Sequence, residues 1–476
     1  MMNRSRWWLY CLSFVGAIAL LSCSEDPPKM NVLLIISDDL NNNIGAYGHP
    51  LVQTPNIDQL AQEGVKFTRA YCQLPLCGPS RVSILTGLYP DSTNVLINET
   101  NFRDYRPDAV TLPQLFMNNG YFTARVGKLF HYGVPGDIGT DGLDDTLSWN
   151  ERRNPKGRDK WDEDQVINLT PNKHLGASLS FLQADGEDKE QTDGMVATEI
   201  IDLLSMHQEE PFFIASGFFR PHCPYIAPKK YFDLYDTAEI VIPKLGNDRE
   251  DIPELAVSTV ADPNYGLPES DLKLAVQAYY ASISFMDAQV GRILNALDSL
   301  GLKDNTIVVF TSDHGYNLGE HGLWHKFNLF EEANLVPLIV SAPGHDGGGD
   351  ISKLTEMVDL YPSLAELAGL DAPKNLNGRS FVPLLTNPEL SWRRAAHMVV
   401  ARPDGTPDRS KPNWGMQLLG RSVRTDRWRY TEWKQGEYGK ELYDHVSDPK
   451  ELTNLAMDSA YSETVSELKE LLKSQR

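Results

Sequence analysis

Acidic residues follow two apolar segments that lie far apart in the chain. NVLLIISDD (31–39) ends in Asp38 and Asp39, and TIVVFTSDHG (306–315) carries Asp313 and His314 after its apolar run. In parallel α/β sheets, ligands bind beyond the carboxyl ends of the strands. Three carboxylates gathered there repel one another unless a cation lies between them, and oxygen ligands suit calcium or magnesium. The pattern predicts a metal site, although either pair alone could simply cap a turn.

The stretch LPLCGPSRVSILTG (74–87) places Cys77 just ahead of a predicted helix start, with Arg81 one turn into the helix. Taken alone, Cys77 could be half of a disulfide with Cys72, a buried small apolar residue, a metal ligand or a nucleophile. The N–H groups at a helix start and an arginine both stabilise an oxyanion such as sulfate or phosphate. The stretch therefore favours an anion-binding site next to Cys77.

Further basic side chains occur just after apolar stretches. They are Lys128 and His131 in GYFTARVGKLFH (120–131), His222 in FFRPHCPY (218–225) and Lys326 in GEHGLWHKF (319–327). Each alone could be a solvated lysine or a histidine hydrogen-bonded in a loop. Together with the acidic residues they describe a cation and basic groups around one nucleophile. That is the arrangement needed to break a charged ester.

The elements that must position these residues alternate between apolar strands and helices from Met30 onward. This order predicts an α/β fold with a mostly parallel sheet sandwiched by helices. The expected strands are 31–39, 211–219, 306–315 and 335–344, and the expected helices are 54–65, 80–87, 111–120 and 272–300. The polar stretches 132–175 and 236–268 predict long loops, which often border a site. We expect a catalytic domain over residues 31–375 and a smaller C-terminal α+β subdomain over residues 376–476.

The N-terminus has the features of an export signal. Arg4 and Arg6 precede the apolar run WWLYCLSFVGAIALLSC, which is too short for a comfortable membrane span and ends in Cys23. Its tail resembles a bacterial lipoprotein box, which predicts a signal peptide over residues 1–22, a diacylated Cys23 and a polar tether over residues 23–30. The alternative is an ordinary signal peptide or a short anchor. We expect attachment to the outer membrane or cell surface, with a periplasmic position as the alternative.

Charge and cysteine content argue against a nucleic-acid-binding protein and against a fold held by several disulfides. The formal net charge of −21 argues against nucleic acid as the main partner, because phosphate backbones require a broad basic surface. A small anionic substrate needs only a local basic pocket and remains compatible. Of the five cysteines, Cys72, Cys77 and Cys223 would remain beside a lipidated Cys23 once the signal is removed. This odd number allows one disulfide at most, so no disulfide framework holds the fold.

Several of these stretches resemble the signatures of the type I sulfatases. PLCGPSRVSILTG is similar to their first signature, and GYFTARVGKLFH is similar to their second, with the Gly-Lys pair and the final histidine present. Within that family, NVLLIISDDL, TPNIDQL, SDHGYNLGEHGLWHK and FRPHCPY resemble the iduronate-2-sulfatase branch, to which bacterial ulvan-type polysaccharide sulfatases are also related. The resemblance implies an alkaline phosphatase-like α/β fold with a small C-terminal subdomain.

The resemblance also implies specific chemistry. Cys77 would be oxidised to Cα-formylglycine by a formylglycine-generating or radical maturase enzyme, and the aldehyde would hydrate to a geminal diol. One calcium ion would be held by Asp38, Asp39, Asp313 and His314 together with the modified Cys77. A diol oxygen would attack sulfur, and the covalent sulfate ester would then collapse to release sulfate. Arg81, Lys128 and Lys326 would bind the negative charge, and His131 or His222 would move the protons.

The substrate expected from this resemblance is a sulfated oligosaccharide, either a glycosaminoglycan fragment or ulvan. Arg103 and Arg106 in NETNFRDYR (98–106) are candidates for binding a uronate carboxylate. The basic segment NERRNPKGRDKW (150–161) is a second candidate loop, or else a solvated surface. The rival functions are a phosphatase or phosphonate hydrolase of the same fold, and a non-catalytic glycan-binding lipoprotein.

Overall fold

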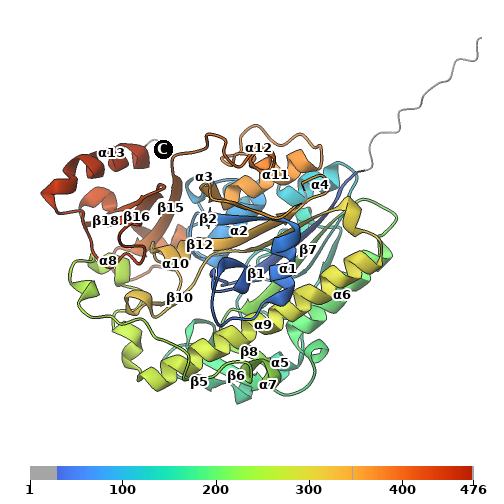
Figure 1. Cartoon of the computed structure of the whole chain (residues 1–476), viewed down its shortest axis with the longest axis horizontal. Helices are drawn as coiled ribbons and strands as arrows, with labels where there is room; N and C mark the ends of the chain where they lie inside the picture. Colours follow the sequence, from blue (N-terminus) through green and yellow to red (C-terminus); the bar gives the residue numbers. More distant parts are fainter. Residues whose placement is uncertain (1–28, 346, 474–476) are drawn as a thin grey trace, which may run out of the picture.

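A nine-stranded sheet forms the centre of the molecule in the computed structural model, which describes residues 29–345 and 347–473. Figure 1 shows this sheet between two layers of helices, with a smaller lobe at one side. The strands are β1 (Asn31–Asp38), β2 (Val65–Tyr71), β3 (Phe122–Gly127), β4 (Glu151–Arg153), β7 (Phe212–Pro221), β9 (Thr306–Ser312), β12 (Leu335–Ser341), β13 (Gly349–Ile351) and β14 (Thr355–Glu356). The predicted signal peptide and Cys23 lie outside the described residues.

The predicted mostly parallel sheet is confirmed. Its strand order is β13-β2-β12-β9-β1-β7-β3-β4, with β14 also paired to β2. The central strand β1 pairs in parallel with β7 on one side and β9 on the other. Only β12 runs against its neighbours, since it is antiparallel to both β2 and β9. The carboxyl ends of β1, β7, β9 and β3 therefore meet at one edge of the sheet.

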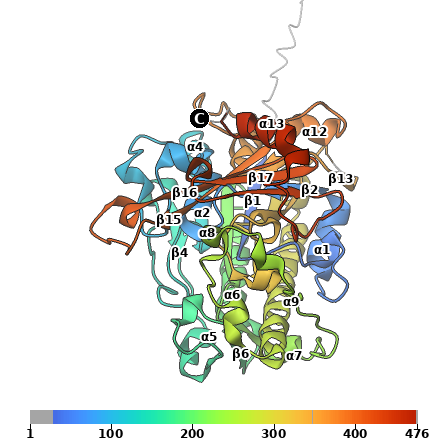
Figure 2. The ribbon, with the colours of Figure 1, turned by 90° about the vertical axis from the view of Figure 1, so that its left-hand side faces the viewer.

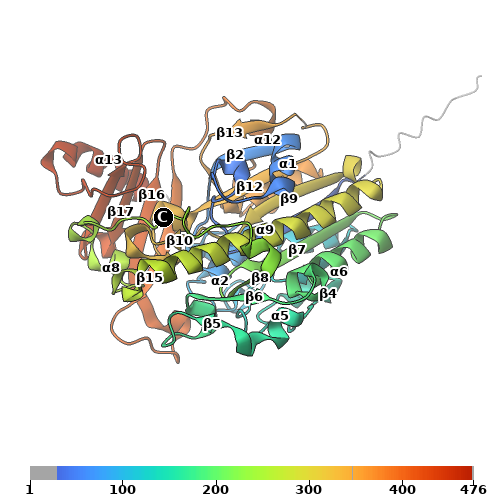
Figure 3. The same ribbon diagram turned by 60° about the horizontal axis from the view of Figure 1, so that its bottom comes forward.

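The two faces of the sheet pack against different helices because side chains alternate along each strand. In β1, Leu33 and Ile35 face one core, whereas Val32, Leu34 and Ile36 face the other. The helices of the first core are α1 (Pro55–Glu63), α6 (Thr192–Met206) and α9 (Glu269–Ser299). Those of the second are α2 (Cys77–Thr86), α4 (Leu112–Asn118), α11 (Leu360–Leu367) and α12 (Val382–Thr386). Figure 3 shows α6 and α9 lying along the underside of the sheet.

Short elements occupy the two segments predicted to be long loops and the turns around the site. They include a three-stranded sheet of β5 (Ile167–Asn168), β6 (Ser180–Ala184) and β8 (Tyr225–Pro228), a hairpin of β10 (Asn317–Leu318) and β11 (Trp324–His325), and the helices α3 (Pro90–Thr93), α5 (Arg158–Trp161), α7 (Lys229–Phe232), α8 (Glu254–Val257) and α10 (Glu331–Asn334). None of the helices within residues 29–345 and 347–473 combines the length and apolar character of a transmembrane span.

The C-terminal lobe is a four-stranded antiparallel sheet with one helix, as Figure 2 shows from that side. Its elements are β15 (Ala396–Pro403), β16 (Met416–Arg424), β17 (Trp428–Trp433), β18 (Lys440–Asp444) and α13 (Ser462–Lys473). Phe381 and Leu384, around α12, pack in the core of the large sheet. The large domain therefore extends beyond residue 375, and the C-terminal lobe begins between α12 and β15.

Buried ion pairs join the C-terminal lobe to the large domain. Glu331 of α10 accepts hydrogen bonds from Arg424 and Arg429, and its carboxylate also accepts one from Tyr71. Glu451 pairs with Arg429 and with His445 and accepts a hydrogen bond from the Glu331 backbone N–H. Because Arg429 is 1 % exposed, these contacts tie the two lobes together in a region that excludes water.

Candidate active site

The predicted gathering of acidic side chains occurs where β1 and β9 end. Ser37 of β1 lies opposite Ser312 of β9, so the residues that follow each strand emerge side by side. The backbone N–H of Asp39 donates to Asp313 Oδ1 at 3.1 Å. Asp39 also has a φ of +67°, a conformation that costs a residue with a side chain about 1 kcal/mol or more. The neighbouring contacts hold this turn in place against that cost.

Cys77 joins this group as the first residue of α2. Its Sγ lies 3.4 Å from His314 Nε2 and 3.7 Å from Asp39 Oδ1, and the residue is 1 % exposed. All ten residues of α2 are buried, so the helix fixes Cys77 rigidly at this point. Gly78 follows because a Cβ there would lie only 2.9 Å from Asn98 Cα. The helix begins three residues earlier than the sequence predicted.

The carboxylates and the imidazole of this cluster could hold a divalent cation, with the Cys77 thiol beside them. One ligand atom from each of Asp39, Cys77, Asp313 and His314 lies within 4.8 Å of the others, and Asp38 and His222 join Asp39 and Cys77 in an overlapping group. His314 Nδ1 donates to the Gly315 carbonyl at 2.9 Å, so Nε2 is the ring nitrogen that faces the cluster. Burial lowers the pKa of His314, but the charges of Asp313 and Cys77 outweigh it and raise the pKa to about 9. Such a site attracts positive charge.

Arg81 clamps the two strand ends together. Its Nε donates to Asp313 Oδ2 at 2.9 Å, and its Nη2 donates to Asp38 Oδ1 at 3.0 Å. Its Nη1 donates to the carbonyls of Lys128 and Leu129. Because four of the five N–H donors of this fully buried side chain are engaged by the protein, Arg81 positions the acidic residues and can offer at most one N–H to a bound anion.

Two lysines complete the charge balance of the cluster. Lys128 Nζ lies 2.7 Å from Asp38 Oδ2, and Lys326 Nζ lies 2.5 Å from Asp39 Oδ2. Burial would raise the pKa of Asp38, but Lys128 and the other basic groups around it together outweigh burial and hold that pKa well below its usual range. Burial raises the pKa of Asp39 to about 8 even though Lys326 opposes it. Asp39 therefore gains most from a further cation.

The segment that presents Lys326 is held in an unusual backbone conformation. His325 and Phe327 have φ values of +68° and +71°, and each flanks the lysine directly. The Phe327 N–H donates to the Pro75 carbonyl at 2.9 Å, and Arg402 donates to the Phe327 carbonyl at 2.5 Å. These contacts link Lys326 to the Cys77 segment and to the C-terminal lobe.

Two neutral histidines belong to the surroundings of this cluster. His222 Nε2 lies 3.8 Å from Asp39 Oδ2, and its Nδ1 pairs with the Cys223 carbonyl. Burial, reinforced by Lys326, holds the pKa of His222 well below its usual value. Burial and the charge of Lys128 do the same for His131, whose Nδ1 is buried without a hydrogen-bond partner. Both rings are therefore in the neutral form, which carries a lone pair on one nitrogen.

Sequence reasoning missed two supporting residues. Tyr279 of α9 donates to the Asp39 carbonyl at 2.8 Å and accepts from the Asn41 N–H at 3.1 Å. Asn98 accepts from the Gly78 N–H at 2.8 Å and so caps the turn that presents Cys77. A tyrosine on the apolar face of a long helix was a weak signal for the first contact. No signal in the sequence pointed to the second, because it depends on loop packing.

The structure does not bring Arg103 to a position where it can bind substrate. Its five N–H donors are all engaged, by Asp145 twice, by the carbonyls of Pro107 and Ala109, and by Gln114. Arg106 is exposed and makes only a 3.5 Å contact with the Tyr105 carbonyl. The expectation that Arg103 binds a uronate carboxylate is therefore wrong, because no donor remains for it.

Two further alternatives are settled by contacts. Cys72, Cys77 and Cys223 are free thiols, so the Cys72–Cys77 disulfide does not form. The basic segment 150–161 pairs with nearby acids instead of forming a patch: Arg153 contacts Glu199 and Asp202, and Arg158 contacts Asp162. The arginines of this segment are therefore paired with acidic side chains of neighbouring segments.

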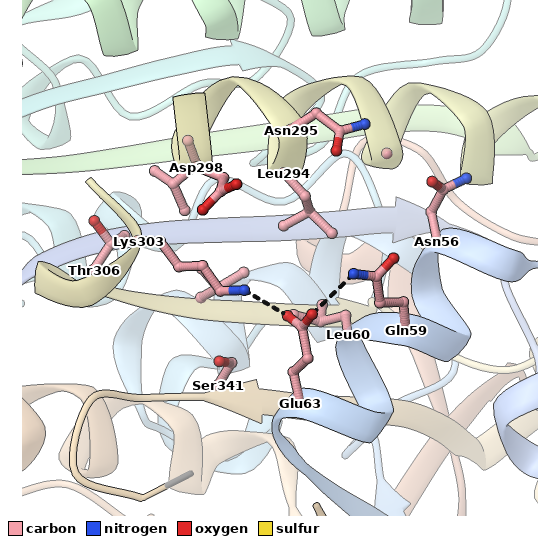
Figure 4. Close-up of a pocket in the computed structure, with 13 residues that line it drawn as sticks. Asn56, Gln59, Leu60, Glu63, Leu294, Asn295, Asp298, Lys303, Thr306 and Ser341 are labelled. Atoms are coloured by element: carbon pink, nitrogen blue, oxygen red, sulfur yellow. Dashed lines mark hydrogen bonds and ion pairs between the residues drawn. The ribbon is translucent and has the colours of Figure 1, made fainter. Parts of the chain in front are cut away.

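A separate pocket lies at the other edge of the sheet (Figure 4). It is lined by the first residue of β9, Thr306, and the last residue of the antiparallel β12, Ser341. Within the pocket, the Glu63 carboxylate accepts hydrogen bonds from Lys303 at 3.0 Å and from Gln59 at 2.9 Å. The pocket lies at the opposite end of β9 from Asp313 and takes no part in the cluster.

Comparison with known proteins supports the chemistry expected of this cluster. Residues 30–370 match the family model described as Sulfatase, and residues 319–476 match the model described as N-sulphoglucosamine sulphohydrolase, C-terminal. The chain is 32 % identical to a "Sulfatase" of Formosa agariphila, over 96 % of this chain and 90 % of the relative. It is 33 % identical to human iduronate 2-sulfatase, over 96 % and 97 % of the two chains.

Among solved structures, the phosphonate monoester hydrolase of Agrobacterium radiobacter has a TM-score of 0.79 at 26 % identity, covering 94 % of this chain and 95 % of that one. This similarity confirms the alkaline phosphatase-like α/β fold with a smaller C-terminal lobe. The family match covers more than two thirds of the chain and includes every residue of the cluster. The protein is therefore a sulfuric ester hydrolase that belongs to the sulfatase family.

Proposed function

We propose that this protein removes sulfate from fragments of acidic polysaccharides, using a formylglycine derived from Cys77 and one calcium ion. The observation that carries the proposal is the buried meeting of Cys77 with Asp39 and His314 beside Lys326. A cysteine used only for packing would not be surrounded by so many charged groups. The mature residue would be produced by a formylglycine-generating or radical maturase.

Asp38, Asp39, Asp313 and His314 would hold the calcium ion, since they supply the oxygen atoms and the imidazole nitrogen of the cluster. When bound, calcium polarises the sulfate group, and the formylglycine supplies a hydrated aldehyde as the nucleophile. Lys128 and Lys326 stabilise the negative charge that accumulates around the ester. Arg81 keeps Asp38 and Asp313 at the spacing that the ion requires.

His222 is the better-placed proton acceptor. Its Nδ1 donates to the Cys223 carbonyl, so Nε2 carries a lone pair and faces the cluster. A neutral ring at this point takes a proton from the nucleophile and can later return one to the leaving alcohol. His131 is the alternative for the second of these steps. Burial keeps both rings neutral before reaction, and the low pKa makes a ring that has taken up a proton a good donor to the leaving alcohol.

The proposed substrate class is a sulfated oligosaccharide that contains acidic sugars, from a glycosaminoglycan or from ulvan. The similarity to iduronate 2-sulfatase over nearly the whole chain supports a uronate-containing substrate. The similarity to a phosphonate monoester hydrolase keeps one rival, the cleavage of phosphonate or phosphate esters. The matches to sulfatases over 96 % of this chain favour sulfate esters.

Desulfation of defined heparan and ulvan oligosaccharides tests the substrate class, with aryl sulfate, aryl phosphate and aryl phosphonate esters assayed in parallel. We expect sulfate release from at least one acidic oligosaccharide and little turnover of the phosphorus esters. Mass spectrometry of the Cys77 peptide should show the aldehyde or its hydrate. Faster cleavage of a phosphonate ester than of every sulfate ester would overturn the assignment.

We also propose that the protein is a lipoprotein of the bacterial outer membrane or cell surface, anchored through Cys23. The lipobox-like sequence supports this location. Replacement of Cys23 by serine should move the protein from the membrane fraction to the soluble fraction while sulfatase activity persists. An unchanged distribution after fractionation would contradict the anchor.

A further inference from the structure

Three side chains from separate segments meet beside Lys326. They are Lys173 from the turn between β5 and β6, Tyr265 from the loop before α9, and His325 at the end of β11. Lys173 Nζ lies 4.8 Å from the centroid of the Tyr265 ring, and the Tyr265 and His325 rings are 6.2 Å apart. His325 precedes Lys326, whose Nζ lies 2.6 Å from Asp39 Oδ1. This group, the Lys173 cluster, therefore borders the catalytic residues.

Backbone strain accompanies this arrangement. Asn264 and Tyr265 are consecutive residues with φ values of +53° and +56°, and His325 has a φ of +68°. Each such residue costs on the order of 1 kcal/mol, and such conformations concentrate at ligand-binding sites. Trp324 Nε1 donates to Asn264 Oδ1 at 2.8 Å and joins the two strained segments. The fold thus holds Tyr265 over His325 at an energetic cost.

Two members of the cluster carry a polar group that has no hydrogen-bond or ion-pair partner among the residues that the structure describes. Among the residues that the structure describes, Lys173 Nζ has no ion pair and only the Tyr265 ring beside it. His325 Nδ1 is 2.6 Å from the Tyr316 hydroxyl, while its Nε2 is buried without a partner. Burial lowers the pKa of His325 to about 3, so the ring is neutral and carries one N–H. The Tyr225 and Tyr316 hydroxyls are 2.7 Å apart, so when Tyr225 donates to Tyr316, Tyr316 donates to Nδ1 and the N–H of His325 lies on Nε2.

We propose that Lys173, Tyr265 and His325 form a subsite that binds an anionic group on the sugar carrying the scissile sulfate. The aromatic face of Tyr265 packs against the sugar ring, while Lys173 and the His325 Nε2–H bind the anion. The anion is a uronate carboxylate or a second sulfate, since both present oxygen acceptors of the same kind. This inference rests on the proposed function, because it specifies which acidic sugar enters the site.

Binding to a catalytically inactive protein tests the subsite without relying on turnover. In a Cys77→Ala background, the ligands are a sulfated disaccharide with a free uronate, its methyl ester, and a disulfated disaccharide without a carboxylate. Lys173→Met should weaken binding of one of the two anionic ligands at least tenfold and leave the methyl ester unchanged. Which anionic ligand responds identifies the anion. Lys173→Arg should restore most of the affinity, and Lys374→Met, at an exposed site, should have no effect.

If Lys173→Met weakens the binding of all three ligands equally, or of none of them, the proposed subsite does not exist. Tyr265→Leu provides an independent variant and should weaken the methyl ester as well, because it removes the stacking surface. With Cys77 intact, Lys173→Met should hydrolyse an aryl sulfate as fast as the unmodified protein does. If the unmodified protein cleaves no sulfate ester at all, the proposed function fails, whereas the binding comparison still decides whether the subsite exists.

Discussion

Arg103 and Arg106 are three positions apart in one loop but differ completely in their surroundings. Asp145, the acidic partner of Arg103, is 5 % exposed, whereas Arg106 is exposed and contacts only a neighbouring carbonyl at 3.5 Å. Removing one member of a mostly buried pair leaves the other charge without compensation, which costs ~3 kcal/mol. Replacing Arg103 should therefore affect the stability of the fold, and the same replacement at Arg106 serves as its control.

Arg103→Ala should lower the free energy of unfolding by about 3 kcal/mol and leave KM for an aryl sulfate unchanged. Arg106→Ala should change the free energy of unfolding by about 0.5 kcal/mol or less. Urea unfolding and steady-state kinetics of both variants check this expectation. A large rise in KM for Arg103→Ala without loss of stability would show that its bonds to Asp145 open in solution.

Cys77 and Cys72 provide a second comparison between single residues. Both thiols are buried, but only Cys77 contacts Asp39 and His314, whereas Cys72 contacts the Ala333 carbonyl at 3.8 Å. Cys77→Ala should abolish sulfate release, by a factor of about 10³ or more, with little change in the melting temperature. Cys72→Ala should remain active and lose a small amount of stability. Comparable activity losses in both variants would contradict a unique role for Cys77.

The C-terminal sheet depends on buried carboxylates for its attachment to α10. Burial would raise the pKa of Glu451, but Arg429 and His445 outweigh it and lower the pKa to about 2, compared with a usual value of 4.5. Because the folded-state pKa is the lower one, this stabilisation is fully present above about pH 4.5. It is lost as the pH falls toward 2, when Glu451 takes up a proton.

The free energy of unfolding should therefore fall steeply below pH 4.5, as urea titrations at several pH values can measure. Glu451→Gln should be less stable at pH 7 by about 2–3 kcal/mol, and its stability should depend less on pH in the acid range. Glu467→Gln, at an exposed position of α13, serves as the control. Parallel pH profiles for Glu451→Gln and the unmodified protein would refute this attachment.

The elements also show what sequence reasoning could and could not achieve. The apolar runs 31–39 and 306–315 predicted buried strands, and the acids after them predicted where a site would lie, because parallel strands share one carboxyl edge. The run 335–344 has the same apolar character, yet β12 is antiparallel, since strand direction depends on the path of the chain. The positions of Arg81 and Arg103 depend on acceptors far away in sequence, so their roles became visible only in three dimensions.

At the scale of the whole molecule, the proposed cation site brings together segments from residue 38 to residue 314. A ligand that binds only the folded state stabilises it by RT ln(1 + [L]/Kd), or about 2.7 kcal/mol at a hundredfold excess over Kd. Calcium should therefore raise the melting temperature of the chelator-treated protein by several degrees. Asp313→Asn should abolish this rise, and Asp304→Asn, at an exposed site, should preserve it. An equal rise in all three proteins would place the bound calcium elsewhere.

The direction of β1 would determine how the proposed lipid anchor orients the enzyme at a membrane. The strand enters the sheet at Asn31 and reaches the catalytic cluster at Asp38, and eight residues of strand span about 25 Å. An anchor ahead of Asn31 would thus hold the molecule by the edge farthest from Cys77. The catalytic end of the sheet would then point away from the bilayer, so that sulfated chains in the surrounding medium need not pass between protein and bilayer.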